Sequence, residues 1–324
     1  MFDLSAGLAL LTSPAVLFFF VGAAAAFAGS DLTIPEPIAK TISLYLMLCI
    51  GFKGGVEAGA AGLSNDFLIA GGIGLALSAL MPIPAFLILK LMPRLDRSTA
   101  CALAATYGSV SVVTFAAGQQ HLASLGLAPD GFMAAVLALM EAPAILTAIL
   151  LLNRSGEIKS GQGGHVLKDA FFGAATVMLL GSFLVGVLSG KPGMDKIELF
   201  VGPLFQGVLC FFLLDLGLVA ARRLMEGGRK LTAGVVAFAL GFPVLSASLA
   251  LGVSYLAGLG PANAALLTIL AGSASYIAVP AAMRLAVPNA DPGVFVTASL
   301  AITFPFNLTI GIALYTAAAQ WLWS

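Results

Sequence analysis

Two short polar motifs lie in the middle of long apolar stretches, and their residue types and spacing suit a binding site. Gly108-Ser109-Val110-Ser111 and Gly272-Ser273-Ala274-Ser275 share the pattern Gly-Ser-x-Ser. Glycine weakens a helix by about 1 kcal/mol relative to alanine, and serine can hydrogen-bond the backbone groups that a break sets free. We therefore expect two broken helices, whose second halves begin near Val110 and Ile277 with their N-termini pointing inward.

Two inward-pointing helix N-termini would form an anion site. Their free N–H groups and positive dipole ends attract negative charge, and nearby hydroxyl groups add neutral donors. Close helix packing would explain one such motif equally well, but the repetition of the motif favours a functional interpretation. The sequence thus predicts a site for a small, singly charged oxyanion, with the substrate-binding residues Gly108, Ser109, Ser111, Thr114, Gly272, Ser273, Ser275 and Tyr276.

Acidic residues inside apolar stretches are costly, and each is therefore a candidate for function. Glu141 precedes Pro143, which frees a carbonyl group beside it. Glu141 could coordinate a cation, carry a proton or pair with a basic group. The predicted cation-binding residues are Glu141, Ser275 and Asn307, whereas Asp215, two residues from Gly217, is explained more simply by close packing.

Motifs for catalysis are absent from the sequence. It has no Ser-His-Asp order, no His-Glu-x-x-His and no Gly-x-x-x-x-Gly-Lys. Its two histidines form no metal cluster, and its three cysteines lie in apolar runs without metal-ligand spacing. The sequence therefore predicts neither an enzyme with catalytic residues nor a structural metal site.

The composition places these residues in a membrane. Of the 324 residues, 60% are hydrophobic and only 9% are charged, with 15 basic and 15 acidic residues. A soluble domain carries about 25% charged residues, so this chain cannot form an ordinary polar shell. The composition excludes a cytosolic enzyme, and the balanced charge argues against binding to nucleic acid. An integral membrane protein is expected.

Ten stretches meet the length of roughly 20 mainly apolar residues that a spanning helix needs. The predicted fold class is therefore an all-α integral membrane protein, with the two broken helices in spans 4 and 9. The predicted spans are 7–28, 38–58, 67–91, 98–121, 131–152, 169–189, 199–221, 232–258, 262–285 and 293–322.

The distribution of basic residues predicts the orientation. Of the 15 lysines and arginines, 12 lie in the odd-numbered connections between spans and three in the even-numbered ones. Cytoplasmic loops carry the excess of basic residues. The protein is therefore predicted to be multi-pass in the plasma membrane, with both termini outside the cytoplasm.

Matched spacings predict two inverted repeats. Five spans lie in residues 1–152 and five in residues 169–324, joined by a polar cytoplasmic linker, 153–168. An odd number of spans in each half makes the halves enter the membrane from opposite faces, which is typical of secondary transporters. Besides Gly-Ser-x-Ser, the shared spacings are Pro37 to Gly51 with Pro203 to Gly217, and Gly131-Pro143-Thr147 with Gly293-Pro305-Thr309.

The chain resembles the sodium-dependent bicarbonate transporter family over nearly its whole length. The stretches that carry the resemblance occur in the same order. They are Ile34-Pro35-Glu36-Pro37-Ile38, Ile50-Gly51-Phe52-Lys53-Gly54-Gly55, Tyr107-Gly108-Ser109-Val110-Ser111, Leu139-Met140-Glu141-Ala142-Pro143 and Arg284 through Pro292, which includes Val287-Pro288-Asn289-Ala290-Asp291-Pro292.

This resemblance implies an architecture and an activity. Spans 1, 2, 6 and 7 would form a gate domain, and spans 3–5 and 8–10 a core domain. Bicarbonate would be imported with sodium, the chain would assemble as a homotrimer, and a small regulatory protein could bind on the cytoplasmic side. By position, the anion site falls at Gly108, Ser109, Ser111, Thr114, Ser273 and Ser275.

The chain also departs from the family pattern. Tyr276 stands where the family has an acidic residue, Ala278-Val279 where it has Ser-Gly, and Glu141 where it has Asp. The leading hypothesis is sodium-dependent bicarbonate uptake by an elevator-type alternating-access mechanism. Two alternatives stay open: a transporter of an organic carboxylate or a proton-coupled substrate on the same fold, and a membrane sensor that does not transport.

Overall fold

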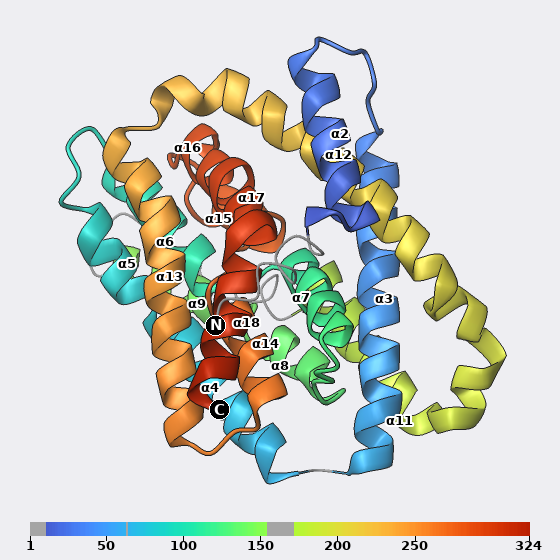
Figure 1. Ribbon diagram of the computed structural model, residues 1–324. Coiled ribbons are helices and arrows are strands. Elements are labelled where there is room, and N and C mark those ends of the chain that lie inside the picture. The colour runs from blue at the N-terminus through green and yellow to red at the C-terminus, as the bar shows by residue number, and fades with distance from the viewer. Residues whose placement is uncertain (1–10, 63, 154–171) are drawn as a thin grey trace.

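The computed structural model describes residues 11–62, 64–153 and 172–324, and every regular element in these ranges is a helix (Figure 1). Eight helical stretches in the described ranges are long and apolar enough to cross a membrane, and two shorter apolar helices accompany them. Four of the eight are single helices, and the other four each join two or more of the helices given below. The all-helical membrane class is confirmed, while the division into ten spans stays a prediction. The predicted linker lies outside the described residues except for Asn153, as do residues 7–10 of the first predicted span.

The first half of the chain contains α2 to α9. Their bounds are α2 (Pro14–Phe27), α3 (Glu36–Ala61), α4 (Asn65–Leu80), α5 (Pro82–Leu89), α6 (Arg97–Gly108), α7 (Val112–Ser124), α8 (Met133–Leu139) and α9 (Pro143–Asn153).

The second half contains α11 to α18. Their bounds are α11 (Ala174–Val201), α12 (Pro203–Gly227), η1 (Gly228–Lys230), α13 (Ala233–Leu256), α14 (Pro261–Ala271), α15 (Ala278–Ala286), α16 (Pro292–Val296), α17 (Phe304–Phe306) and α18 (Ile312–Leu322), with π-helical segments η2 (Thr297–Thr303) and η3 (Asn307–Gly311).

Residues 190–198, which the sequence analysis treats as a connection, form the junction between two helical parts of α11, with non-helical backbone at Gly190 and Ile197. Gly190 adopts φ 54°, a left-handed conformation that glycine accepts readily, and Pro192 follows it inside the helix. The chain changes direction at this point without an intervening loop. The last helix shows a related adjustment, because η2 and η3 lie on either side of Pro305, which lacks an N–H group.

Glycines bring α3 and α11 into backbone contact. Gly51, Gly55 and Gly59 recur every four residues and share one face of α3. A Cβ atom at Gly55 would collide with the backbone of Phe183, and one at Gly51 with the carbonyl group of Leu179. Small residues at such spacing let membrane helices pack closely.

The helices α2 and α12 form a second pair of this kind. A Cβ atom at Gly22 would meet the carbonyl group of Leu214, and one at Gly217 would meet that of Phe19. Gly51 and Gly217 are counterparts in the predicted repeats, and each lies at a tight helix crossing. Both pairs lie on the same side of the molecule, away from α13 and α18 (Figure 1).

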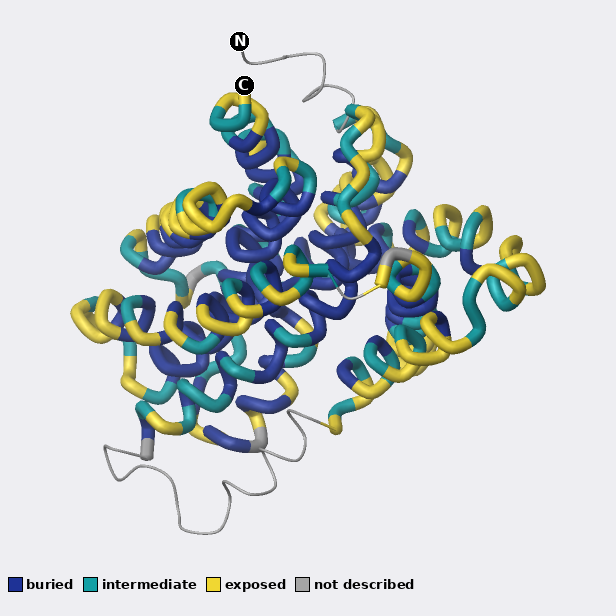
Figure 2. The backbone as a smooth tube through the Cα atoms, turned by 90° about the horizontal axis from the view of Figure 1, so that it is seen from below, coloured by how far each residue is buried: buried dark blue, intermediate teal, exposed yellow. Residues whose placement is uncertain are grey.

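The interior of the molecule is formed by α6, α7 and α14. All residues of α6 from Thr99 to Gly108 are buried, as are all residues of α14 from Asn263 to Ala271. Helices α4, α5, α9, α13 and α18 surround them. Buried residues accordingly concentrate in the middle of the molecule, and exposed ones lie on its outer helices (Figure 2). The two Gly-Ser-x-Ser motifs therefore lie at helix ends that protein, and not lipid, surrounds.

Hydrogen bonds and an ion pair join four of the odd-numbered connections at one end of the bundle. Arg222 Nη2 donates to the carbonyl oxygen of Leu32 at 2.7 Å, Lys230 Nζ lies 2.7 Å from Asp291 Oδ2, and the Asp291 N–H donates to Thr99 Oγ1 at 2.8 Å. The ammonium group of Lys230 holds the pKa of the Asp291 carboxyl below its usual value. Four of the basic connections thus share one face, as the predicted orientation requires, and the identity of that face as cytoplasmic stays a prediction.

Replacing Gly55 with alanine tests the close packing of α3 on α11. We expect Gly55→Ala to lower the free energy of unfolding by about 1–3 kcal/mol, because its Cβ atom would force the two backbones apart. Gly72→Ala is the matched control, since Gly72 is exposed on α4 and faces open space. Thermal unfolding of the purified protein measures both. Equal effects of the two substitutions would contradict the close packing.

Candidate anion site

The helix that begins at Arg97 loses its regular hydrogen bonding at the first Gly-Ser-x-Ser motif. α6 ends at Gly108, Ser109 and Ser111 are extended, and α7 begins at Val112. Gly108 permits this ending to pack tightly, because a Cβ atom there would collide with the ring of Pro82. Ser111 then caps α7, since its Oγ accepts the Thr114 N–H at 3.1 Å.

The second motif ends α14 in a similar way. α14 stops at Ala271, and α15 begins at Ala278. A Cβ atom at Gly272 would collide with the ring of Tyr315 and would lie 3.1 Å from the methyl group of Ala247. Ser275 Oγ accepts the Val279 N–H at 3.3 Å. The next residue, Pro280, has no N–H group, so α15 keeps few free donors at its start.

The two non-helical segments cross and hydrogen-bond each other. The Ser111 N–H donates to Ser273 Oγ at 2.9 Å, and the Ser275 N–H donates to the carbonyl oxygen of Thr106 at 2.8 Å. Ser111 Oγ donates to Tyr276 Oη at 3.1 Å. Segments about 165 residues apart in the chain thus satisfy one another's backbone groups. Such partners are required because the bilayer offers none.

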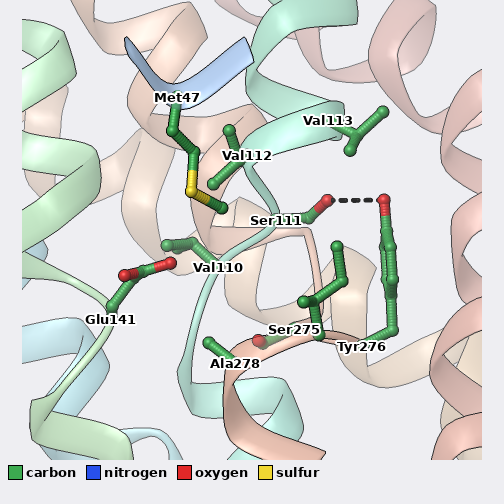
Figure 3. Close-up of a pocket in the computed structure, with 10 residues that line it drawn as sticks. Met47, Val110, Ser111, Val112, Val113, Glu141, Ser275, Tyr276 and Ala278 are labelled. Atoms are coloured by element: carbon green, nitrogen blue, oxygen red, sulfur yellow. Dashed lines mark hydrogen bonds between the residues drawn. The ribbon is translucent and has the colours of Figure 1, made fainter. Parts of the chain in front are cut away.

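A pocket of about 250 Å³, counting its open mouth, lies beside this crossing (Figure 3). The α7 and α15 ends contribute most of its lining, and two residues come from elsewhere: Met47 from α3, and Glu141 from the residues between α8 and α9. Figure 3 shows Met47 and Glu141 entering from the side opposite Tyr276. The lining is Met47, Val110, Ser111, Val112, Val113, Glu141, Ser275, Tyr276, Ile277 and Ala278.

Glu141 is a buried carboxylate at this pocket. Its Oε2 accepts a hydrogen bond from Thr176 Oγ1 of α11 at 3.1 Å, and its carbonyl oxygen accepts one from Ser109 Oγ at 3.2 Å. None of the ion pairs within the described residues involves it. An ionised carboxylate buried without a counter-charge is costly. The site therefore suits a cation or a proton at Glu141.

The lining of the pocket contains no basic side chain, so any positive potential there comes from the backbone. The first N–H groups of a helix have no acceptor within it, which leaves those of Val112 and Val113 at the start of α7. They lie at the positive end of the helix dipole. The positive end of α7 thus lies near Ser111, whereas an ionised Glu141 would add negative charge to another part of the lining.

The structure brings together four of the predicted site residues. Ser111, Ser275, Tyr276 and Glu141 line the pocket. The others flank it: Ser109 and Ser273 bond the crossing segments, Thr114 completes the cap of α7, and Gly108 and Gly272 allow close packing. Asn307 does not line the pocket. Its Nδ2 donates to the carbonyl oxygen of Gly272 at 2.9 Å, and its Oδ1 is buried without a partner among the described residues.

Sequence reasoning missed Met47 and Thr176. Both belong to helices outside the two motifs, and both reach the site from α3 and α11. Neither residue stands in a recognisable pattern, so no signal in the sequence could have found them.

The chain matches the family model described as the Na+-dependent bicarbonate transporter superfamily over residues 14–320. The chain belongs to this superfamily. A search of curated proteins gave no match. Membership confirms the resemblance seen in the sequence. It supports a multi-pass membrane transporter with bicarbonate as the anion and sodium as the coupling ion that the family's name suggests.

Ser273 and Ser275 should respond differently to replacement by alanine. Ser273→Ala leaves the buried Ser111 N–H without its acceptor, so we expect a loss of about 1–3 kcal/mol in the free energy of unfolding. Ser275→Ala removes only a 3.3 Å bond and a pocket hydroxyl group, so we expect it to weaken anion binding more than stability. Thermal unfolding with and without bicarbonate separates the two. The reverse order of effects would contradict this division of roles.

Proposed function

We propose that this chain is a secondary active transporter that takes up a small oxyanion together with a cation, with sodium-coupled bicarbonate uptake as its leading form. One observation carries the proposal: a pocket beside two crossing, non-helical segments, with a helix N-terminus on one side and a buried carboxylate on the other. Binding of opposite charges at neighbouring positions lets each ion raise the affinity for the other, which is one way to couple their transport. Membership of the superfamily supports the same function.

The anion would be held by neutral donors. Those at hand are the free N–H groups of Val112 and Val113 and the hydroxyl groups of Ser111, Ser275 and Tyr276. Such donors stabilise a single negative charge and release the anion readily. A buried lysine or arginine would hold the anion more tightly. Weak, reversible binding is what a transporter needs.

The cation would neutralise Glu141. A carboxylate and a bound anion in one pocket repel each other, so neither is stable there unless a cation accompanies them. Sodium accepts oxygen ligands, and Glu141 and Ser275 supply them in the pocket. Asn307 stays a predicted ligand, although it lies outside the lining. A proton is the second candidate, because Thr176 is the one hydrogen-bond partner described for the Glu141 side chain.

The packing supports an elevator-type mechanism. Helices α2, α3, α11 and α12 correspond to the predicted gate spans, and their glycine-packed pairs would form a rigid scaffold. The pairing also fits inverted repeats. Span 2 of the first half corresponds to span 7, and span 6 of the second half corresponds to span 1. The pair α3 and α11 is therefore the repeat counterpart of the pair α12 and α2. Met47 and Thr176 reach the site from this gate, so the pocket lies where a sliding core would pass. Assembly as a homotrimer and control by a cytoplasmic protein stay predictions of the family resemblance.

Replacing Glu141 with glutamine tests the coupling. In proteoliposomes containing the purified chain, we expect an imposed sodium gradient to drive accumulation of labelled bicarbonate. Glu141→Gln should lose this accumulation and retain exchange of internal for external anion, because the anion donors are untouched. Asp215→Asn, a buried carboxylate of α12 outside the pocket lining, is the matched control and should retain coupling.

Each alternative gives a different result in this assay. Accumulation driven by a proton gradient alone would identify the proton, and not sodium, as the coupled cation. Full sodium-driven accumulation by Glu141→Gln would contradict the role of Glu141. Binding of bicarbonate without flux under either gradient would contradict transport and favour the membrane sensor.

A further inference from the structure

Two side chains of the predicted gate reach the site that the predicted core forms. Met47 of α3 extends into the pocket beside Ser111 (Figure 3), and Thr176 of α11 contacts the carboxylate of Glu141. Apart from Met47, every residue of the lining belongs to the predicted core spans. The enclosed part of the pocket has room for about one water molecule, which is too little for a bicarbonate ion. The anion can therefore enter only when side chains around the pocket withdraw.

The contact of Thr176 with Glu141 joins the gate to the core at the carboxylate itself. Thr176 Oγ1 donates to Glu141 Oε2 at 3.1 Å, and both residues are buried. A hydroxyl donor stabilises an ionised carboxylate, as a bound cation does. A cation that binds Glu141 Oε2 therefore competes with the Thr176 hydroxyl group for the same oxygen.

This hydrogen bond connects two parts that move apart in an elevator-type mechanism. Thr176 lies on α11, which packs closely on the glycines of α3, and Glu141 lies between α8 and α9 of the core. Without a cation, breaking the bond takes a donor away from a buried carboxylate, which is costly. With a cation at Glu141 that cost disappears. The bond therefore stabilises the narrow pocket only while no cation is bound.

We propose that Thr176 is a latch between gate and core: its hydroxyl group on Glu141 keeps the pocket narrow until a cation at Glu141 replaces it and lets the pocket open for the anion. This inference rests on the proposed function and adds a control to the same site. Thr176 acts through Glu141 and is a positioning residue. The latch also sets an order of binding, in which the cation precedes the anion.

Removing the hydroxyl group of Thr176 tests the latch. Thr176→Val keeps the shape of the side chain, and Thr176→Ala removes the same hydroxyl group should the valine variant fail to fold. Calorimetric titration of the full chain in lipid nanodiscs would measure three affinities: sodium alone, bicarbonate without sodium, and bicarbonate at saturating sodium. A latched pocket lowers the apparent affinity for each ion, because only the unlatched fraction of molecules can bind it.

The three affinities should change in different ways. We expect Thr176→Val to bind sodium alone about tenfold more tightly, which is the effect of losing one hydrogen bond to a charged group. Bicarbonate without sodium should also bind more tightly to this variant. At saturating sodium, bicarbonate should bind equally to the variant and to the wild type, because the cation has opened both. A merely structural role of Thr176 would not produce this dependence on sodium.

Two further variants serve as controls. Thr176→Ser keeps the hydroxyl group and should bind both ions as the wild type does. Thr147→Val removes a hydroxyl group from the core at a distance from the pocket lining, since Thr147 Oγ1 donates to the carbonyl oxygen of Ala79 at 2.7 Å. It should leave all three affinities unchanged.

The failure of this inference can be distinguished from that of the proposed function. An unchanged sodium affinity in Thr176→Val, or an equal change in Thr147→Val, would overturn the latch and leave coupled transport intact. Weaker sodium binding by Thr176→Val would also overturn the latch, and would identify Thr176 Oγ1 as a ligand of the cation. A wild-type chain that binds neither sodium nor bicarbonate would overturn the proposed function together with this inference.

Discussion

The structure depends on one constraint: backbone groups freed inside a membrane protein must find partners within it. Two helices end and restart in the buried interior, and their open groups are paired across the crossing by Ser111 with Ser273 and by Ser275 with Thr106. Not every group is paired in this way. The N–H groups that remain at the start of α7 are those that could hold an anion, so the site is formed by what the crossing leaves unsatisfied.

Glycine serves two different purposes in this fold. At Gly108 and Gly272 it lets a helix end lie against neighbouring side chains, which keeps the crossing compact. At Gly51, Gly55 and Gly217 it lets whole helices approach backbone to backbone. In water, hydrophobic burial would hold such helices together; in lipid, close packing has to do so. The high glycine content therefore fits both a rigid scaffold and an interrupted core.

The sequence allowed much of the site to be predicted, because its signals are local. Gly-Ser-x-Ser in an apolar stretch indicates an interruption, and a carboxylate near a proline in such a stretch indicates a polar site within the membrane. These signals identified Ser111, Ser275 and Glu141, and the family resemblance drew attention to Tyr276. All four line one pocket.

The remaining features depend on how distant helices pack, which no local pattern records. Met47 and Thr176 enter the site only because α3 and α11 lie against the core. Asn307 was expected beside Glu141, but it donates to the carbonyl oxygen of Gly272 from a π-helical segment near Pro305. The kink in α11 likewise depends on the left-handed conformation of Gly190, which its sequence permits and does not require.

The central claim is that neutral donors at the crossing, and not basic side chains, hold the transported anion. An electron cryomicroscopy map of the protein saturated with its anion tests this most directly. The account predicts density within about 3 Å of the Val112 and Val113 N–H groups and the Tyr276 hydroxyl. Density against the lysines and arginines of the basic connections, with none at the crossing, would contradict it.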